Sequence, residues 1–253
     1  MPEYDSYAQF YDTSHGAIPD DIPFFAELAR EANGPVCELA CGTGRILIPL
    51  ARAGIEVTGL DVSQAMLDVL QAKLDKEPRD VQARVALKCA NMRDYRFSQK
   101  SRLVFCAFNS FQHLMTTDDQ LACLRSVREY LADDGRLVLN VFAPDYCRLN
   151  GRDETMIHVE PDPETGRDMT VTNISKRHLA SQTMEVWQCV DRIGDDGTVR
   201  RYPASFTLCW IHHHEMHLLL RCAGYEVVNV YGGYDKRPYD YVSGIQLFEA
   251  RKV

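Results

Sequence analysis

The stretch VCELACGTGRI (36–46) places a short apolar run directly before a glycine-rich turn. Residues 36–40 have the length and apolarity of a buried strand, and residues 45–53 have a helical pattern that Gly54 closes. Glycines at such a junction let the backbone pass close to a ligand, and the helix that follows presents free N–H groups. We therefore expect a ligand-binding turn at the carboxyl end of the first strand.

Strands and helices alternate around this stretch. Further strands are expected at 55–60, 81–88, 103–108, 136–142, 225–231 and 243–251, and helices at 20–32, 63–77, 117–131 and 211–223. Asp20 or Asp21, Ser63, and Thr116 or Thr117 are the expected N-caps of the first three of these helices. This order predicts an α/β fold, a doubly wound, mostly parallel Rossmann-like sheet of about seven strands.

The pattern changes at Pro144. From about residue 155 to 210, apolar and polar residues alternate, as in 169–174, 183–192 and 198–208, and turn clusters stand at 161–163 and 194–197. We expect residues 144–210 to form an inserted antiparallel sheet in a core made of residues 1–143 and 211–253. Because the insertion follows the fifth strand, we expect it to bind the substrate, and a homodimer through this sheet is a further expectation.

Composition narrows the class of protein. The chain has 253 residues, of which 45% are hydrophobic, and a formal net charge of -8. An acidic chain is unsuited to sequence-independent binding of nucleic acid. There is no apolar run of about 18 residues and no signal peptide, so we expect a cytoplasmic protein that does not cross a membrane. Nine cysteines without a CxxC pair argue against a zinc knuckle or a redox pair.

The glycine-rich turn lacks the features of a phosphate site. A dinucleotide fingerprint needs a small residue where Leu47 stands, and no Gly-Lys-Ser/Thr follows the turn. The acidic residue of the turn, Glu38, comes before the glycines, which suits a cationic ligand group better than a pyrophosphate.

Polar residues also follow the next three strands. Asp61 ends the second strand in GLDVS (59–63), where a carboxylate can accept both hydroxyl groups of a ribose. NMRDY (91–95) follows the third strand, and the Asn91 side chain or the Met92 backbone could contact an adenine amine. FNSFQHL (108–114) follows the fourth. All of these segments are expected at one edge of the sheet.

At this point the chain resembles the class I S-adenosylmethionine-dependent methyltransferases. ELACGTG (38–44) is similar to their first motif, GLDVS to their ribose-binding motif, NMRDY to their adenine-binding motif, and DGRLVLNVF (134–142) to the segment of their fifth strand. The similarity covers residues 4–143 and the last two strands. YDSYAQFYD (4–12) and FNSFQHL also resemble small-molecule members, including sugar N-methyltransferases that act on nucleotide-linked amino sugars. This narrower similarity does not extend clearly into 145–210.

The resemblance implies S-adenosylmethionine as the cofactor and assigns residues to its parts. The glycines approach its amino-acid end, Asp61 holds the ribose, Val62 or Met66 flanks the adenine, and an N-terminal tyrosine, Tyr11 or Tyr4, closes over it. Asn91 and Met92 contact the adenine edge. The complete predicted cofactor set is Tyr11, Glu38, Ala40, Gly42, Gly44, Asp61, Val62, Met66, Asn91, Met92, Arg93 and Asn109.

Other reactive side chains have two interpretations each. His113 is the candidate general base, and the alternative is a structural histidine that caps the following turn. His213 and His217 share a helix face, but the spacing is not His-Glu-x-x-His, so no metal site is expected. Cys41 is interpreted as a small residue that fills the tight turn and not as a nucleophile. Tyrosines at 231, 234, 239 and 241 line a pocket or interface, or stand at strand edges, and the sequence does not decide between these.

The predicted function is transfer of a methyl group to a nitrogen or oxygen of a small molecule. Two alternatives stay open, because the motifs describe cofactor binding and not the reaction. One is an enzyme that uses S-adenosylmethionine without methylating. The other is a non-catalytic binding protein of the same fold.

Overall fold

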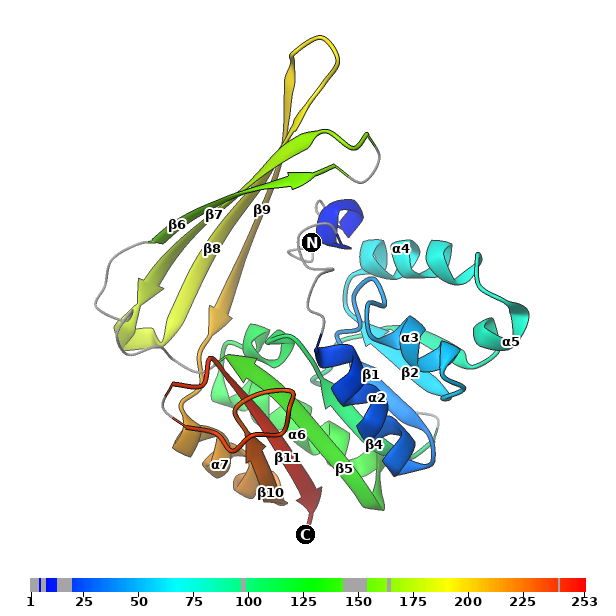
Figure 1. Cartoon of the computed structure of the whole chain (residues 1–253). Helices are drawn as coiled ribbons and strands as arrows, with labels where there is room; N and C mark the ends of the chain where they lie inside the picture. The colour runs from blue at the N-terminus through cyan, green and yellow to red at the C-terminus, as the bar shows by residue number, and fades with distance from the viewer. Residues whose placement is uncertain are drawn as a thin grey trace.

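The computed structural model describes residues 5, 8–12, 20–96, 99–142, 154–162, 165–240 and 242–253. It contains a seven-stranded sheet in the order β10-β11-β5-β4-β1-β2-β3 and a separate four-stranded sheet in the order β6-β7-β8-β9 (Figure 1). This confirms the predicted α/β fold with an added antiparallel sheet. Tyr4 and Tyr241 lie outside the described residues.

The larger sheet is mostly parallel. Its strands are β1 (Val36–Leu39), β2 (Val57–Asp61), β3 (Val85–Cys89), β4 (Ser101–Cys106), β5 (Leu131–Phe142), β10 (Tyr225–Tyr231) and β11 (Ile245–Lys252). The first five pair in parallel, and β11 lies antiparallel between β5 and β10. The glycine-rich turn and the polar segments after β2, β3 and β4 therefore meet at one edge, as the sequence predicts.

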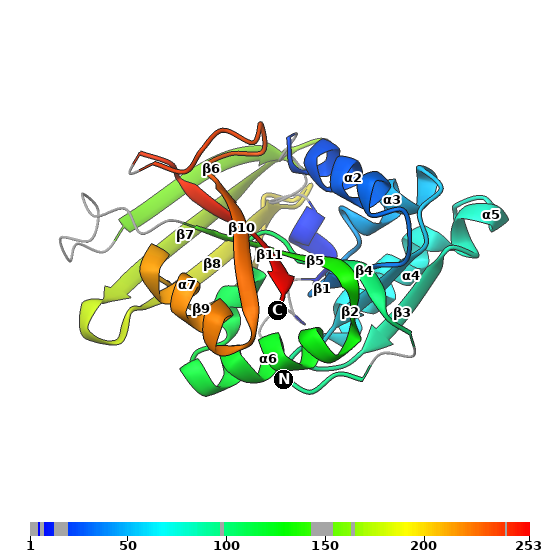
Figure 2. The ribbon, with the colours of Figure 1, turned by 90° about the horizontal axis from the view of Figure 1, so that it is seen from below.

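Helices cover both faces of this sheet (Figure 2). One core cluster takes side chains from α2 (Asp21–Ala32), α3 (Leu47–Arg52) and α4 (Gln64–Leu74), and the other from α6 (Thr117–Tyr130) and α7 (His213–Cys222). Within β4, Phe105 belongs to the first cluster and its neighbours Val104 and Cys106 to the second. Because both faces are covered, the strand is apolar along its length, which is the signal the sequence carries.

The smaller sheet comprises β6 (Glu154–Pro161), β7 (Asp168–His178), β8 (Thr183–Ile193) and β9 (Val199–Cys209), all antiparallel. Figure 1 shows it standing over the edge of the larger sheet, with the short helix η1 (Ala8–Phe10) between it and α4. The Phe10 ring packs on that of Tyr202, with centroids 4.3 Å apart. Residues of the four-stranded sheet and of the edge of the core line one shared cavity, which is described below.

Two predicted boundaries are wrong. The strand expected at 81–88 begins at Val85, because residues after Pro78 form the short helix α5 (Arg79–Gln82), which buries Val81. The strand expected at 136–142 begins at Leu131, directly after α6 ends at Tyr130, so residues 133–135 lie within the strand. A register shift between Ser101 and Leu103 of β4 accommodates these residues. β6 was not among the strands named from the sequence, although it lies in the alternating region.

The helix starts also differ in part. Ser63 and Thr116 cap their helices as predicted, since their hydroxyls accept from the amides of Met66 and Asp119. Asp20 makes no capping hydrogen bond from its side chain, and Asp21 binds Arg45 instead. α3 begins at Leu47, two residues later than predicted, although the Ile48 amide already donates to the carbonyl oxygen of Gly44 at 3.0 Å.

Candidate active site

The glycine-rich turn has three left-handed residues. Ala40, Gly42 and Gly44 have φ angles of 54°, 52° and 81°. A Cβ on Gly44 would lie 2.2 Å from Leu70 Cδ1, so this glycine lets the turn pack against α4. A Cβ on Gly42 would meet no heavy atom within 4 Å. Gly42 is therefore a glycine for its backbone angle, and its open side faces the cavity described below.

Asp61 ties this turn to the end of β2. Its Oδ2 accepts from the amide of Gly42 and its Oδ1 from the amide of Ser63, both at 2.8 Å. Burial raises the pKa of the Asp61 carboxyl, and these two backbone hydrogen bonds oppose the rise. A carboxylate has about four lone-pair positions, so Asp61 can still accept from hydroxyl groups of a ligand.

Glu38 lies beneath the turn and not on its open side. It is 4% exposed, and its Oε2 has no hydrogen-bond partner. Burial raises the pKa of the Glu38 carboxyl well above its ordinary value, while Arg45 opposes the rise. The structure therefore gives Glu38 a place in supporting the turn.

Two further residues with left-handed backbone angles follow β4. Phe108 and Asn109 have φ angles of 49° and 64°. Both backbone amides bind Asn140 of β5, that of Phe108 to Oδ1 at 2.9 Å and that of Asn109 to the carbonyl oxygen at 3.1 Å. The Arg45 guanidinium lies 5.6 Å from the centroid of the Phe108 ring, and it forms a bidentate pair with buried Asp21. These contacts hold a strained turn at the site.

The N-terminal segment closes one side of the site. Asp12 accepts from the Thr43 hydroxyl at 2.6 Å and forms an ion pair with Lys73. Asp5 accepts from the Ser63 hydroxyl at 2.6 Å. These contacts bring Tyr11 over the turn, where burial raises the pKa of its phenol.

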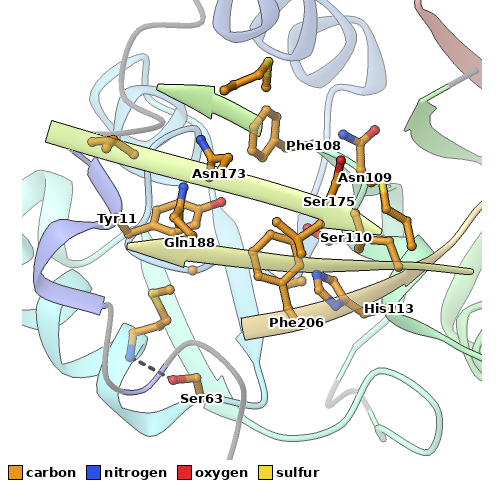
Figure 3. Close-up of a pocket in the computed structure, with 18 of the residues that line it drawn as sticks. Tyr11, Ser63, Phe108, Asn109, Ser110, His113, Asn173, Ser175, Gln188 and Phe206 are labelled. Atoms are coloured by element: carbon orange, nitrogen blue, oxygen red, sulfur yellow. Dashed lines mark hydrogen bonds between the residues drawn. The ribbon is translucent and has the colours of Figure 1, made fainter. Parts of the chain in front are cut away.

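One cavity of about 810 Å³ connects the strand ends to the inner face of the four-stranded sheet. In Figure 3, Tyr11, Asn173 and Gln188 lie together at one part of it, and His113 and Phe206 at another. The centroids of the last two rings are 5.8 Å apart. His113 ends the turn η2 (Ser110–His113) and lines the same cavity as Asp61.

The structure brings nine of the thirteen predicted site residues to this cavity. They are Tyr11, Ala40, Gly42, Asp61, Val62, Met66, Met92, Asn109 and His113. The other four, Glu38, Gly44, Asn91 and Arg93, are not among the residues that line it. Asn91 Oδ1 accepts from the Arg93 amide at 3.0 Å, and Arg93 pairs with Asp119 at 2.7 Å. These contacts hold the turn after β3, and a direct contact with the cofactor stays a prediction for all four.

Sequence analysis missed the far wall of the cavity. It is formed by the inward-facing side chains of the four-stranded sheet, among them Glu154, Met156, His158, Glu160, Val171, Asn173, Ser175, Arg177, Met184, Val186, Gln188, Phe206 and Leu208. The two-residue alternation was visible in the sequence, but it does not say which of the two faces is turned toward the core.

The remaining candidates lie away from the cavity. His213 Nδ1 is 3.1 Å from Gln246 Oε1, and its ring stacks on Tyr239. Within the described part of the chain, no group of three side chains could hold a metal ion. Tyr231 donates to Glu249 and Tyr234 to Asn140, and neither these nor Tyr239 lines the cavity.

Cys41 fills the space beneath the turn. It is 5% exposed, and a Cβ on Gly59 would lie 2.8 Å from its Sγ. Burial raises the pKa of the thiol well above its ordinary value, which disfavours a nucleophilic thiolate. The structure thus confirms its interpretation as a packed residue.

Comparisons with known proteins agree with this geometry. A family model described as a methyltransferase domain matches residues 36–135. The chain is 28% identical to the cypemycin N-terminal methyltransferase of Streptomyces sp over 205 residues. The matched region covers 81% of this chain and 77% of that protein. It is 24% identical over 232 residues to the dTDP-3-amino-3,4,6-trideoxy-alpha-D-glucopyranose N,N-dimethyltransferase of Streptomyces venezuelae, across 90% and 92% of the two proteins.

A solved structure extends the similarity to both sheets. The CcbJ methyltransferase from Streptomyces caelestis superposes with a TM-score of 0.83 at 27% identity, covering 99% of this chain and 98% of that one. The four strand-end motifs, the cavity that they line and these relatives point to the same assignment. The chain carries a methyltransferase domain over residues 36–135, and its similarity to S-adenosylmethionine-dependent methyltransferases extends over both sheets.

Proposed function

We propose that this enzyme methylates a nitrogen of a small molecule, with an oxygen acceptor as the alternative. The observation that carries the proposal is the cavity of about 810 Å³, which has the strand-end motifs on one wall and the four-stranded sheet on the other. One wall suits the cofactor and the opposite wall suits an acceptor. The two ligands would therefore meet inside one enclosed space, where their reacting atoms are held close together.

The first wall fits S-adenosylmethionine. The backbone at Ala40 and Gly42 is open toward the cavity, Asp61 can accept from ribose hydroxyls, and Val62 and Met66 offer apolar surface to an adenine. Asn109 would face the methionine portion. When bound, the cofactor supplies an electrophilic methyl group, so the protein mainly has to bind, orient and exclude water.

The names of the relatives favour nitrogen as the acceptor atom. Two of them are an N-terminal methyltransferase and an N,N-dimethyltransferase. An amine is a nucleophile only when it is deprotonated, which gives a histidine in the cavity a chemical role. We propose His113 as the base that takes this proton, because it stands where the turn after β4 meets Phe206 of the four-stranded sheet.

A homodimer through the four-stranded sheet stays a prediction. The outer face of this sheet exposes Ile157, Val159, Ile174 and Trp187. Sedimentation of the purified protein tests this, and a monomer at micromolar concentration would contradict it. No helix in the described part of the chain has the length and apolarity to cross a bilayer.

The proposal is tested in two steps. Calorimetry with S-adenosylhomocysteine first measures cofactor binding. Transfer of a tritiated methyl group from S-adenosylmethionine to a panel of amines and alcohols then identifies the acceptor atom. Release of S-adenosylhomocysteine with a methylated amine supports the proposal. A different cofactor fragment, such as methylthioadenosine, would indicate a non-methylating reaction, and a lack of cofactor binding would overturn the assignment of this wall.

A further inference from the structure

The acceptor wall of the cavity has an unusual charge arrangement. Arg177 of β7 is the one lysine or arginine among the described residues that line the cavity. Its Nη2 lies 2.7 Å from Oε2 of Glu154, which projects from the neighbouring strand β6 into the same space. The Arg177 side chain is 11% exposed. The guanidinium is therefore already engaged by a carboxylate and is not held open for an anionic ligand.

The surrounding charges have the opposite sign. Three carboxyl groups line the cavity, those of Asp61, Glu154 and Glu160, against one guanidinium, that of Arg177. The formal net charge of these lining groups is -2. Walls of low dielectric concentrate such a field, which attracts cations and repels phosphates. The cofactor carries a sulfonium cation, so the same field suits both a cationic cofactor and an amine acceptor.

The side-chain amide of Gln188 faces the same space, and its oxygen has no hydrogen-bond partner. Gln188 lies on the inner face of β8, directly across from Asn173 on β7 and Ala204 on β9. It is 3% exposed, and its Oε1 has no hydrogen-bond partner (Figure 3). A buried amide oxygen without a donor reduces stability, so its presence at a cavity wall indicates a ligand that brings N–H or O–H groups.

Resting on the function proposed above, we propose that the acceptor is a phosphate-free molecule rich in N–H and O–H donors. Glu154 enforces this selection by occupying Arg177, and Gln188 accepts a hydrogen bond from the acceptor. The relative from Streptomyces venezuelae is named for a nucleotide-linked amino sugar. This enzyme would differ from it in rejecting the diphosphate that such a substrate carries.

The charge selection is tested with thymidine 5′-diphosphate as the probe and protein saturated with S-adenosylhomocysteine. Calorimetry on the wild type should show weak binding or none. Glu154→Gln should bind the probe at least about tenfold more tightly, because it removes the Glu154 carboxylate that competes with the probe for the Arg177 guanidinium. Glu160→Gln is the matched control, since it removes a carboxylate from the same wall and leaves the pair intact, and it should give a smaller gain.

Two results would overturn the selection. One is a wild type that already binds the diphosphate tightly, and the other is a Glu154→Gln variant that binds it no more tightly than the wild type does. Arg177→Met added to Glu154→Gln should abolish any gain. Binding of S-adenosylhomocysteine is measured separately in each variant, so loss of the cofactor site is distinguished from failure of the selection.

The role of Gln188 is tested by thermal unfolding without ligand. Gln188→Leu removes a buried amide that has an unsatisfied oxygen and should raise the melting temperature by about 2–4 °C. Gln112→Leu is the matched control, because the Gln112 amide oxygen accepts from the Phe142 amide at 3.0 Å, and this variant should melt at a lower temperature. A fall in melting temperature for Gln188→Leu would show that the amide serves the fold and would remove it from the acceptor site.

Discussion

The amide of Gly42 donates to Oδ2 of Asp61 at 2.8 Å, which fastens the turn after β1 to the carboxyl end of β2. The carboxylate that is expected to hold the ribose thus also sets the shape of the neighbouring turn. Replacing it should affect cofactor binding in two ways, by losing an acceptor and by loosening the turn.

Asp61→Ala should weaken binding of S-adenosylhomocysteine by at least about tenfold. A hydrogen bond to a charged group contributes about 1.5–3 kcal/mol, and 1.4 kcal/mol corresponds to a factor of ten in Kd. Calorimetry measures the change. Asp68→Ala is the control, because this aspartate binds Gln64 on the exposed side of α4. Equal affinities in the wild type and Asp61→Ala would contradict the assigned site.

A comparison of Gly42→Ala with Gly54→Ala separates the effect of backbone strain on stability from the effect of the glycine-rich turn on cofactor binding. Both glycines have positive φ angles, 52° and 88°, and a Cβ on either would meet no atom within 4 Å. Each substitution should destabilise the fold by about 1–2 kcal/mol, because alanine is disfavoured in the left-handed region. Only Gly42→Ala should also weaken binding of S-adenosylhomocysteine, since Gly54 does not line the cavity. Equal losses of affinity would show that the effect is general.

Glu38→Gln should flatten the dependence of stability on pH. Burial raises the pKa of Glu38, so the folded state holds the proton more tightly than the unfolded state. The stabilisation that Glu38 contributes is therefore complete below the ordinary carboxyl pKa and is lost as the pH rises toward the raised pKa. The free energy of unfolding should fall by up to about 1.4 kcal/mol per pH unit in this range. Urea unfolding of both proteins from pH 5 to 8 measures the difference. Parallel profiles would contradict the raised pKa.

Asp21→Ala should destabilise the fold by about 3–5 kcal/mol, because it leaves the Arg45 guanidinium buried without its counterion. Glu77→Ala is the matched control. Its partner Arg52 is 58% exposed, and loss of this surface pair should reduce stability much less than loss of the buried pair. Chemical denaturation compares the two, and similar losses would show that the buried pair has no special role.

His113→Ala should lower kcat by a factor of about 10²–10⁴ while leaving the Kd of S-adenosylhomocysteine within about twofold of the wild type. The reason is that the variant loses the proton acceptor but keeps the turn after β1. Steady-state kinetics with the identified acceptor gives kcat. If kcat at saturating acceptor stays the same, His113 has a structural role.

Much of the fold follows from local sequence signals. The buried strands are short apolar runs, and Ser63 and Thr116 cap helices at the positions that their side-chain chemistry favours. The predictions that failed depend on tertiary contacts. Val81 is apolar and close to a true strand, yet Pro78 and the core place it in a short helix. Asp21 is a helix-cap candidate by its chemistry, but its carboxylate binds the Arg45 guanidinium, 24 residues later in the chain.

The candidate site divides in the same way. The cofactor wall is built from turns that directly follow strands, so a linear motif such as 38–44 predicts both its position and its chemistry. The acceptor wall is built from alternate residues of four strands. Gln188 and Asn173 are neighbours only because β7 and β8 pair in one particular register. That register depends on the whole sheet, and no short motif encodes it.

The N-terminal segment reaches both walls at once. Phe10 packs on the four-stranded sheet, while Asp12 binds Thr43 in the cofactor turn and Asp5 binds Ser63. The contacts of this one segment thus tie the position of the four-stranded sheet to that of the cofactor turn.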